Sequence, residues 1–300
     1  MSLTTERVLV IGASGQVGRA LCAAFGGDYP LVAAGHQHAE GDHERLDLAD
    51  AESIRAVWQK VNPSIVLLAG GMCNVDGCEL EPTRSHAVNV AGTAAVADVA
   101  RQTGALVVFF STDHVFDGAR ESYGEEDDVS PMNVYSRSKA EAEAALRAAL
   151  PDRHLILRTS SVYGVDRYRR NFVIRFVDSL TAGRPVTVPD DQWGSPTHTE
   201  DLARATRVLV DTGLRGTFHA TGPDFVDRAT FARRICAQFA LDPSLIVPRP
   251  TSALGQAALR PRGVKLDCRK LLAAGVPPFM TIDEGLARLR AAIEASVLAS

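Results

Sequence analysis

Hydrophobic and polar residues follow two different patterns along this chain. Short, continuous apolar runs are typical of strands buried on both faces of a sheet, and they occupy residues 7–11, 31–34, 64–68, 106–110 and 154–157. Amphipathic segments of helical periodicity follow several of these runs, at residues 16–25, 83–102 and after Pro131. Because strands that alternate with helices pair in parallel, the pattern predicts an α/β fold with a doubly wound parallel sheet.

The regular alternation ends near Gly164, which predicts a second lobe. We expect a nucleotide-binding domain at residues 1–164, to which the chain returns at about 195–222. Residues 165–194 and 223–300 then form a smaller C-terminal lobe, which we expect to bind substrate. The elements expected in this half of the chain are four helices and one strand. The helices are one after Phe172 that ends near Gly183 and those at 200–210, 231–239 and 282–295, and the strand is at 216–220.

The composition of the 300 residues narrows the range of partners. A net charge of −4 disfavours a nucleic-acid-binding surface, and the sequence has no uncharged apolar run of the ~18 residues that a membrane span needs. The first residues lack a signal-peptide pattern and the 5 cysteines are never spaced as C-x-x-C, so we expect reduced thiols in a cytoplasmic protein. The histidine-rich loop at 36–43 has no fixed ligand geometry, so we expect no metal site.

A glycine-rich turn joins the first strand to the first helix. Glycines in such a turn let the backbone approach a pyrophosphate, which then faces the helix N-terminus. The third apolar run ends in small residues that let a ribose approach the backbone. The residues expected to hold a dinucleotide here are Gly12, Ser14, Gly15, Gln16, Val17, Gly18, Ala69, Gly70 and Gly71.

The end of the second strand bears on the choice of cofactor. NAD usually calls for an acidic residue there, to accept a hydrogen bond from the ribose 2′-hydroxyl. Gly35 and His36 stand at that place, and Glu40 follows a few residues later. Arg19 and His36 suit a 2′-phosphate instead, so the sequence favours NADP(H) over NAD(H).

Polar residues at the end of a strand and in the next helix form a candidate catalytic group. Ser111, Thr112 and Asp113 follow a buried strand, at the edge where open α/β sheets bind ligands. Tyr135 and Lys139 are four residues apart and share one helix face. A cation within about 4–6 Å favours the ionised phenol, so Lys139 would make Tyr135 an acid or base near neutral pH. The alternative is an ordinary surface pair without chemistry.

Thr112, Tyr135 and Lys139 together resemble the Ser/Thr-Tyr-Lys triad of the extended short-chain dehydrogenase/reductases. The runs S-T-D-H-V-F-D-G, P-M-N-V-Y-S-R-S-K and D-D-Q-W-G-S-P-T more narrowly resemble the dTDP-4-dehydrorhamnose reductases and their relatives. The resemblance implies a Rossmann fold in which these three residues are catalytic, and in which Tyr135 and Lys139 also touch the cofactor.

The resemblance also implies roles for single residues elsewhere. Further cofactor contacts would be Asp47, Leu48, Ser160, Ser161 and Val162. Substrate contacts would be Asp113, His114, Asn171 and Gln192. Arg260 suits a diphosphate, because a guanidinium binds phosphate through two parallel hydrogen bonds, whereas a surface salt bridge is the alternative. Asn89, in the run N-V-A-G-T, either braces the active site or bonds within its own helix.

The implied activity is NADPH-dependent reduction of a nucleotide-linked 4-keto-6-deoxysugar. His114 replaces the usual Tyr and Ser161 the usual Trp, which predicts a sugar other than the rhamnose precursor. A 4,6-dehydratase is disfavoured, because relatives of that class carry Glu where His114 stands. The run L-G-Q-A-A-L-R-P-R-G-V-K-L resembles the regulatory β subunit of methionine adenosyltransferase. A non-catalytic NADP-binding regulator of a partner enzyme is therefore the alternative, and a homodimer is open in both cases.

Overall fold

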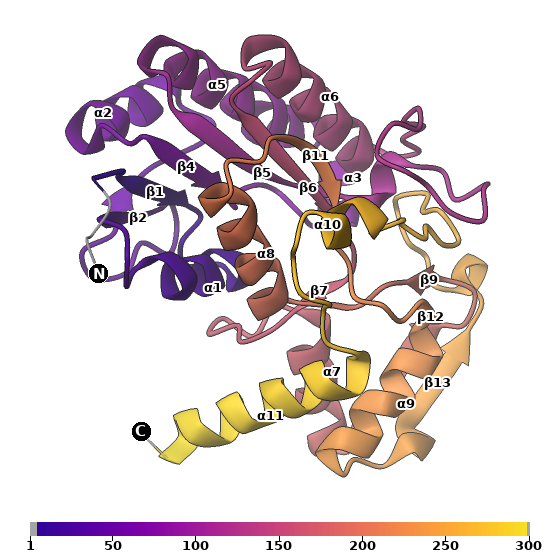
Figure 1. Ribbon diagram of the computed structural model, residues 1–300. Coiled ribbons are helices and arrows are strands. Elements are labelled where there is room, and N and C mark those ends of the chain that lie inside the picture. Colours follow the sequence, from indigo (N-terminus) through magenta and orange to yellow (C-terminus); the bar gives the residue numbers. More distant parts are fainter. Residues whose placement is uncertain (1–4, 299–300) are drawn as a thin grey trace.

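The computed structural model, which describes residues 5–298, is built around a seven-stranded sheet. Its order is β11-β6-β5-β4-β1-β2-β3, and every neighbouring pair is parallel (Figure 1). The strands are β1 (Val8–Ile11), β2 (Leu31–Gly35), β3 (Glu44–Arg45), β4 (Ile65–Leu68), β5 (Leu106–Thr112), β6 (His154–Thr159) and β11 (Gly216–His219). The predicted parallel α/β sheet is therefore confirmed.

Helices cover both faces of the sheet, because successive side chains of each strand point to opposite sides. In β1, Val8 and Val10 pack in one apolar cluster with the first set of helices, α1 (Gln16–Phe25) and α8 (Thr199–Asp211). Leu9 and Ile11 pack in the other cluster. The second set of helices is α2 (Ala51–Val61), α5 (Gly92–Thr103) and α6 (Val134–Ala149).

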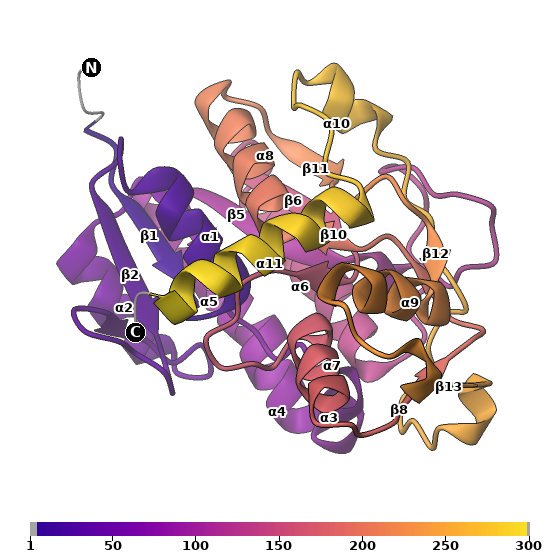
Figure 2. The same ribbon diagram turned by 90° about the horizontal axis from the view of Figure 1, so that it is seen from below.

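A smaller group of elements packs around a third apolar cluster beside the sheet (Figure 2). It contains α7 (Phe172–Thr181), β8 (Val186–Pro189), α9 (Arg228–Phe239), β13 (Ile246–Arg249) and α11 (Ile282–Leu298), with β8 and β13 paired in parallel. Short pairs connect it to the sheet edge: β7 (Val162–Tyr163) with β10 (Thr197–His198), and β9 (Trp193–Gly194) with β12 (Val226–Asp227). The proposed domain boundaries stay a prediction.

The predicted helix at 83–102 is wrong in its interior. The chain forms α4 (Pro82–His86), then a π-helical segment (Ala87–Ala91), and only then α5. The break coincides with non-local contacts: a Cβ on Gly92 would lie 2.3 Å from the carbonyl oxygen of Leu48. Two further helices, α3 (Val75–Leu80) and α10 (Arg269–Ala273), were not expected.

None of the helices in the described part of the chain is long and apolar enough to cross a membrane.

Candidate active site

The carboxyl ends of β5 and β6 bring three polar side chains together. The Thr112 hydroxyl donates to Asp113 Oδ1 at 3.0 Å, and the Ser160 hydroxyl donates to Asp113 Oδ2 at 2.6 Å. All three residues are buried. Asp113 is therefore occupied on both oxygens, and it fixes the orientation of two hydroxyl groups at the end of the sheet.

Tyr135 and Lys139 reach this point from the first turns of α6. The helix begins with a capping box between Asn133 and Ser136, which sets the position of its first turn. Burial raises the pKa of Tyr135 above its ordinary value, and the nearby Thr112 hydroxyl opposes this only in part. The structure thus places Thr112 near Tyr135, as the triad requires.

Lys139 does not do what the sequence predicted. Its Nζ donates to the carbonyl oxygen of Phe110 at 2.6 Å and lies 3.8 Å from the centre of the Phe109 ring. Burial lowers the pKa of Lys139 from 10.5 to about 8, partly opposed by the negative charge of Glu143. The expectation that Lys139 makes Tyr135 acidic is wrong for this structure, because α6 packs against β5 and desolvation dominates at both residues.

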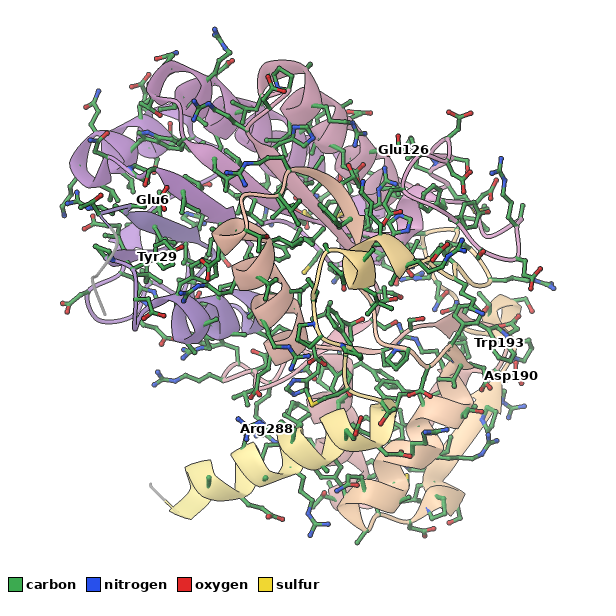
Figure 3. All side chains as sticks on the ribbon, in the orientation of Figure 1. Glu6, Tyr29, Glu126, Asp190, Trp193 and Arg288 are labelled. Carbon is green, nitrogen blue, oxygen red and sulfur yellow. The ribbon has the colours of Figure 1, made fainter. Side chains whose placement is uncertain are left out.

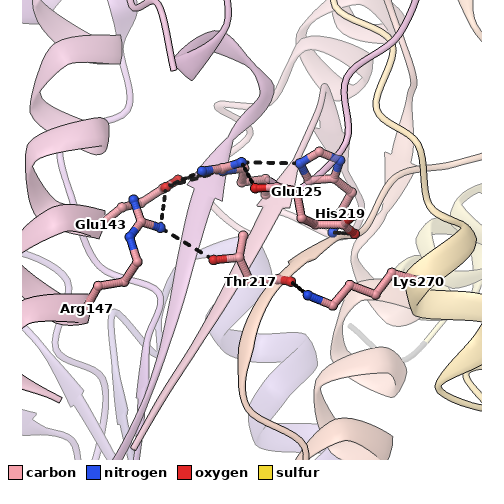
Figure 4. A network of polar contacts seen from close by, with 7 residues as sticks. Glu125, Glu143, Arg147, Thr217, His219 and Lys270 are labelled. Carbon is pink, nitrogen blue, oxygen red and sulfur yellow. Dashed lines mark hydrogen bonds and ion pairs between the residues drawn. The ribbon is translucent and has the colours of Figure 1, made fainter. Parts of the chain in front are cut away.

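A buried ion pair anchors the middle of α6 to the sheet (Figure 4). The Arg158 guanidinium, on β6, donates to both carboxylate oxygens of Glu143, with Nη2 at 2.8 Å from Oε2. Glu143 is fully buried and Arg158 is 2% exposed. Arg147 shares Glu143 from the helix surface, and Arg158 also contacts His219 on β11 at 3.4 Å. Losing one partner of such a pair is costly, so the position of α6 is firmly set.

The structure also decides the role of Asn89. Its Oδ1 accepts from the backbone N–H of Met72 at 2.8 Å, and its Nδ2 donates to the Met72 carbonyl at 2.9 Å. The same Nδ2 donates to the Ser138 hydroxyl at 3.0 Å. Asn89 therefore braces the loop after β4 against α6, and the prediction of an internal helix bond is wrong.

The strand order reverses between β1 and β4, and open α/β sheets bind ligands in the crevice beyond the strand ends at such a point. Gly12 has φ +86°, and a Cβ there would lie 2.5 Å from the backbone nitrogen of Gly70. A Cβ on Gly18 would lie 2.2 Å from the Gly12 carbonyl oxygen. α1 begins at Gln16, after Gly15, with no side-chain cap on its free N–H groups. A tight backbone approach and uncapped helix amides are the features that fit a pyrophosphate.

The other predicted cofactor residues lie around this crevice. Gln16 Nε2 donates to the Val162 carbonyl at 3.2 Å. Its Oε1 accepts from Asn171 Nδ2 at 3.2 Å, so Asn171 lies beside the glycine turn, where it also caps α7. The backbone of Ser161 is strained at φ +46°, a conformation that residues with a side chain seldom adopt.

The two residues predicted to face a 2′-phosphate have partners already. Arg19 Nη2 donates to Glu40 at 2.6 Å, and His36 Nε2 lies 3.3 Å from the Asp47 carboxylate. Glu40 also accepts from the Tyr168 hydroxyl, and these two hydrogen bonds help to lower the pKa of Glu40 to about 2. Glu40, a few residues past the end of β2, therefore lies next to Arg19, because the loop folds back onto α1.

Two predicted substrate residues are also held by other side chains. Arg260 forms a double hydrogen bond with Asp76, at 2.9 and 2.8 Å, so the salt-bridge alternative describes this structure. Gln192 Nε2 donates to Thr251 at 3.0 Å and to Gln256 at 2.8 Å. Neither side chain is free in this structure, and each needs a partner exchange before it contacts a ligand.

His114 lies at the site with an unused polar atom. Its Nδ1 is buried and has no hydrogen-bond partner among the described residues, and its ring packs edge-on to Tyr135 with centroids 6.3 Å apart. Burial lowers the pKa of His114, which keeps the ring neutral. Three residues near the site were missed from the sequence: Cys73, Trp193 and Arg228. Cys73 is an exposed thiol whose charge would raise the pKa of Tyr135.

Comparison with known proteins gives this geometry a family. Residues 6–294 match the family model described as RmlD substrate binding domain. The chain belongs to that family. A dTDP-4-dehydrorhamnose reductase from Bacillus anthracis, solved in complex with NADP, superposes with a TM-score of 0.87 at 30% identity, covering 97% of this chain and 100% of that one.

Named relatives of the RmlD family fall into two groups. A dTDP-4-keto-6-deoxy-D-glucose reductase from Streptomyces niveus is 34% identical over 276 residues, covering 92% of this chain and 93% of that protein. Methionine adenosyltransferase 2 subunit beta from Mus musculus is 30% identical over 303 residues, covering 95% and 89%. The predicted resemblance to both groups is confirmed.

No group of three or more His, Cys, Asp or Glu residues able to hold a metal is found among residues 5–298.

Proposed function

We propose that this protein is an NADPH-dependent reductase of a nucleotide-linked 4-keto-6-deoxysugar. The observation that carries the proposal is the polar group at the end of β5, where Thr112 bonds to Asp113 and the Tyr135 ring lies edge-on to His114. Two hydroxyl groups converge there, beside the glycine crevice between β1 and β4. The similarity to reductases over nine-tenths of the chain supports the same activity.

The residues divide the work in the following way. When bound in the crevice, the reduced nicotinamide supplies a hydride to the carbonyl carbon. Tyr135 gives its proton to the carbonyl oxygen, so the ketone becomes a secondary alcohol and the phenol is left ionised. The Thr112 hydroxyl, which donates to Asp113 in this structure, turns to donate its hydrogen bond to the same oxygen and positions it. Burial raises the pKa of Tyr135, so the phenol is protonated at neutral pH and has a proton to give to the carbonyl oxygen.

The residues around the crevice fit the cofactor by shape. Gly12 and Gly18 allow the turn, the start of α1 and the end of β4 to pack backbone against backbone, and we assign the pyrophosphate to the uncapped N–H groups of α1 and the ribose to Ala69, Gly70 and Gly71. Lys139 lies one turn from Tyr135, and we assign it to the ribose next to the nicotinamide. NADPH is the favoured cofactor because Arg19 stands near the end of β2 and because the Bacillus anthracis relative was solved with NADP.

The decisive experiment measures NADPH oxidation by the purified protein with a panel of nucleotide-linked 4-keto-6-deoxysugars. We expect the protein to reduce at least one of them. We expect Tyr135→Phe to retain only a small residual activity. If no keto-sugar in the panel is reduced while NADPH binds normally, the reductase proposal is wrong.

A second candidate function is that of a regulatory subunit resembling the methionine adenosyltransferase 2 subunit beta. The observation that favours it is the similarity to that protein over 95% of the chain. The run L-G-Q-A-A-L-R-P-R-G-V-K-L, which resembles that subunit, is fixed in this structure by a hydrogen bond from the Ala258 N–H to Asp76 at 3.0 Å. Its Leu259 side chain is 64% exposed. Co-purification with a methionine adenosyltransferase of the same organism, together with a change in that enzyme's rate, would support this function over reduction.

We also propose a cytoplasmic location and a homodimer as the working form. All five cysteines are free thiols in the structure, as expected in a reducing compartment. Light scattering on the purified protein measures the mass in solution, and a single-chain mass at micromolar concentration would contradict the dimer.

A further inference from the structure

An exposed aromatic pair lies at the rim of the molecule beside β9. Trp193 is 47% exposed and stacks on Phe225, with ring centroids 5.9 Å apart and planes 28° apart. We call these two side chains the aromatic ledge. Figure 3 labels Trp193 at this rim, near the junction of the sheet with the smaller group of elements. A half-exposed indole is unusual, since tryptophan is highly buried on average.

The backbone around the ledge holds the indole in place. β9 pairs with β12, which follows Phe225 directly, and the Trp193 N–H donates to the Arg262 carbonyl at 2.6 Å. A Cβ on Gly263 would lie 2.7 Å from the Trp193 Cβ and 3.1 Å from Phe225 Cζ. Both rings therefore sit over a residue that has to be glycine, so their exposure is fixed by the fold.

The ledge is continuous with the candidate active site. A Cβ on Gly194, the residue after Trp193, would lie 2.9 Å from Ser161 Oγ and 3.3 Å from Ser160 Oγ. Ser160 donates to Asp113, the neighbour of Thr112. One residue of backbone thus separates the ledge from the buried hydroxyls at the end of β5 and β6.

A cation without an ionic partner lies between the two places. The Arg228 guanidinium makes no hydrogen bond or ion pair with any residue of the described chain, and it lies 5.3 Å from the centre of the Phe172 ring. The Arg228 N–H donates to the Gln192 carbonyl at 3.0 Å, next to Trp193. Burial lowers the pKa of Arg228, and the negative charge of Asp113 partly opposes this. A partly buried and unpaired guanidinium suits a phosphate.

We propose that the aromatic ledge stacks the base of the nucleotide-linked substrate and that Arg228 binds its diphosphate. The proposal rests on the proposed function, and it names the residues that hold the nucleotide half of the substrate. A nucleotide sugar has its sugar, diphosphate and base in linear order. Arg228 is linked to both ends of this order, because its charge interacts with Asp113, the neighbour of Thr112, and its backbone bonds to Gln192, the neighbour of Trp193. Stacking on an exposed indole is also tolerant of base identity.

The test uses the fact that the chain has 2 tryptophans. Trp58 is 2% exposed in α2, so Trp58→Phe leaves Trp193 as the reporter of the ledge. Thymidine diphosphate should quench its fluorescence, whereas inorganic pyrophosphate should compete for the site without quenching. If Trp58→Phe does not fold, acrylamide quenching of the natural chain measures the same protection, because Trp58 is already shielded.

Substitutions then separate the ledge from the diphosphate site. Trp193→Ala should weaken thymidine diphosphate binding about tenfold in calorimetry, leave pyrophosphate binding unchanged, and raise KM for a keto-sugar nucleotide more than it lowers kcat. Trp193→Phe should restore most of the affinity. Arg228→Met should weaken both ligands, and the exposed apolar control Leu272→Ala neither.

Unchanged affinity for thymidine diphosphate in Trp193→Ala overturns the assignment of the ledge, even if the protein reduces keto-sugars. Quenching and a tenfold loss in Trp193→Ala support the ledge, even if no keto-sugar is reduced. The binding measurements therefore test the aromatic ledge, and the turnover measurements test the proposed function, independently of each other.

Discussion

The two sides of the candidate active site are built in different ways. The cofactor side consists of two short stretches, the turn at Gly12–Gly18 and the end of β4, and it works through backbone and the absence of side chains. The proposed substrate side draws single side chains from distant segments, among them Thr112, Asp113, Gln192 and Arg260. Several of these bond to one another or to neighbours instead of standing free.

This difference has consequences for change by mutation. A site made of backbone and glycine tolerates no added atom, because the clash is with main chain that cannot move away. A site made of side chains already bonded within the protein is adjustable, since a substrate is recognised by exchanging one partner for another. We therefore expect cofactor binding to be lost abruptly by substitution, and substrate preference to shift gradually.

The largest effect should come from Tyr135→Phe. Removing one hydroxyl leaves the ring packed against His114, so the fold and NADPH binding should be unchanged, while kcat for the keto-sugar falls about 10²–10⁴-fold through loss of the general acid. If turnover is lost while the dissociation constant for NADPH stays normal, catalysis and cofactor binding depend on different residues. Tyr29→Phe, distant from the site, is the matched control, and an equal loss of rate there would contradict the assignment.

Gly12→Ala should break the cofactor side. The new methyl group would lie 2.5 Å from Gly70 N at a φ of +86°, so both the fold and the crevice are strained. We expect NADPH affinity to fall by roughly tenfold to a hundredfold, measured by quenching or calorimetry. Gly27→Ala is the control, since nothing lies within 4 Å of its added Cβ. Normal NADPH binding by Gly12→Ala would refute the crevice.

The dependence of kcat/KM on pH tests the role of Lys139, which we place between the cofactor side and the substrate side. The pKa of Lys139 is lowered to about 8, so its ammonium is present below that pH and is lost as the pH rises through it. If the Lys139 charge holds the cofactor ribose, kcat/KM should fall about tenfold per pH unit above about 8. Lys139→Arg does not titrate in this range, and its residual activity should lack that decline. A decline that persists in Lys139→Arg belongs to another group.

The smallest effect concerns the pair of Arg19 and Glu40. Its side chains are 33% and 23% exposed, so solvent screens the interaction and a modest change is expected. Glu40→Gln removes the negative charge beside a 2′-phosphate, and NADPH affinity should rise a few-fold relative to NADH. Arg19→Ala should lower it by a similar factor. The measurement is the ratio of the dissociation constants for NADPH and NADH. If this ratio does not change, or changes in the opposite direction, Arg19 and Glu40 do not recognise the 2′-phosphate.

The same contrast explains what the sequence could predict. The glycine turn, α1 and the parallel sheet follow from local patterns, and the helix at 16–25 has the predicted bounds. For Arg260 the sequence left a diphosphate contact and a salt bridge open, because its partner Asp76 is 184 residues away in the chain. Arg19 and Glu40 are 21 residues apart and meet only because a loop folds back. The burial of Lys139 depends on how α6 packs on β5, which periodicity does not determine.

The π-helical segment at Ala87–Ala91 has a consequence for insertions and deletions. A π turn holds about one residue more than an α turn, and such segments are frequent at functional sites. Removing a single codon here would let the helix continue as a regular α-helix, yet it would rotate Asn89 away from Met72 and Ser138 by about one residue's turn. The helix would become a regular α-helix, and the loop beside the active site would lose its hydrogen bonds to Asn89. The length of this segment is therefore constrained more tightly than its composition.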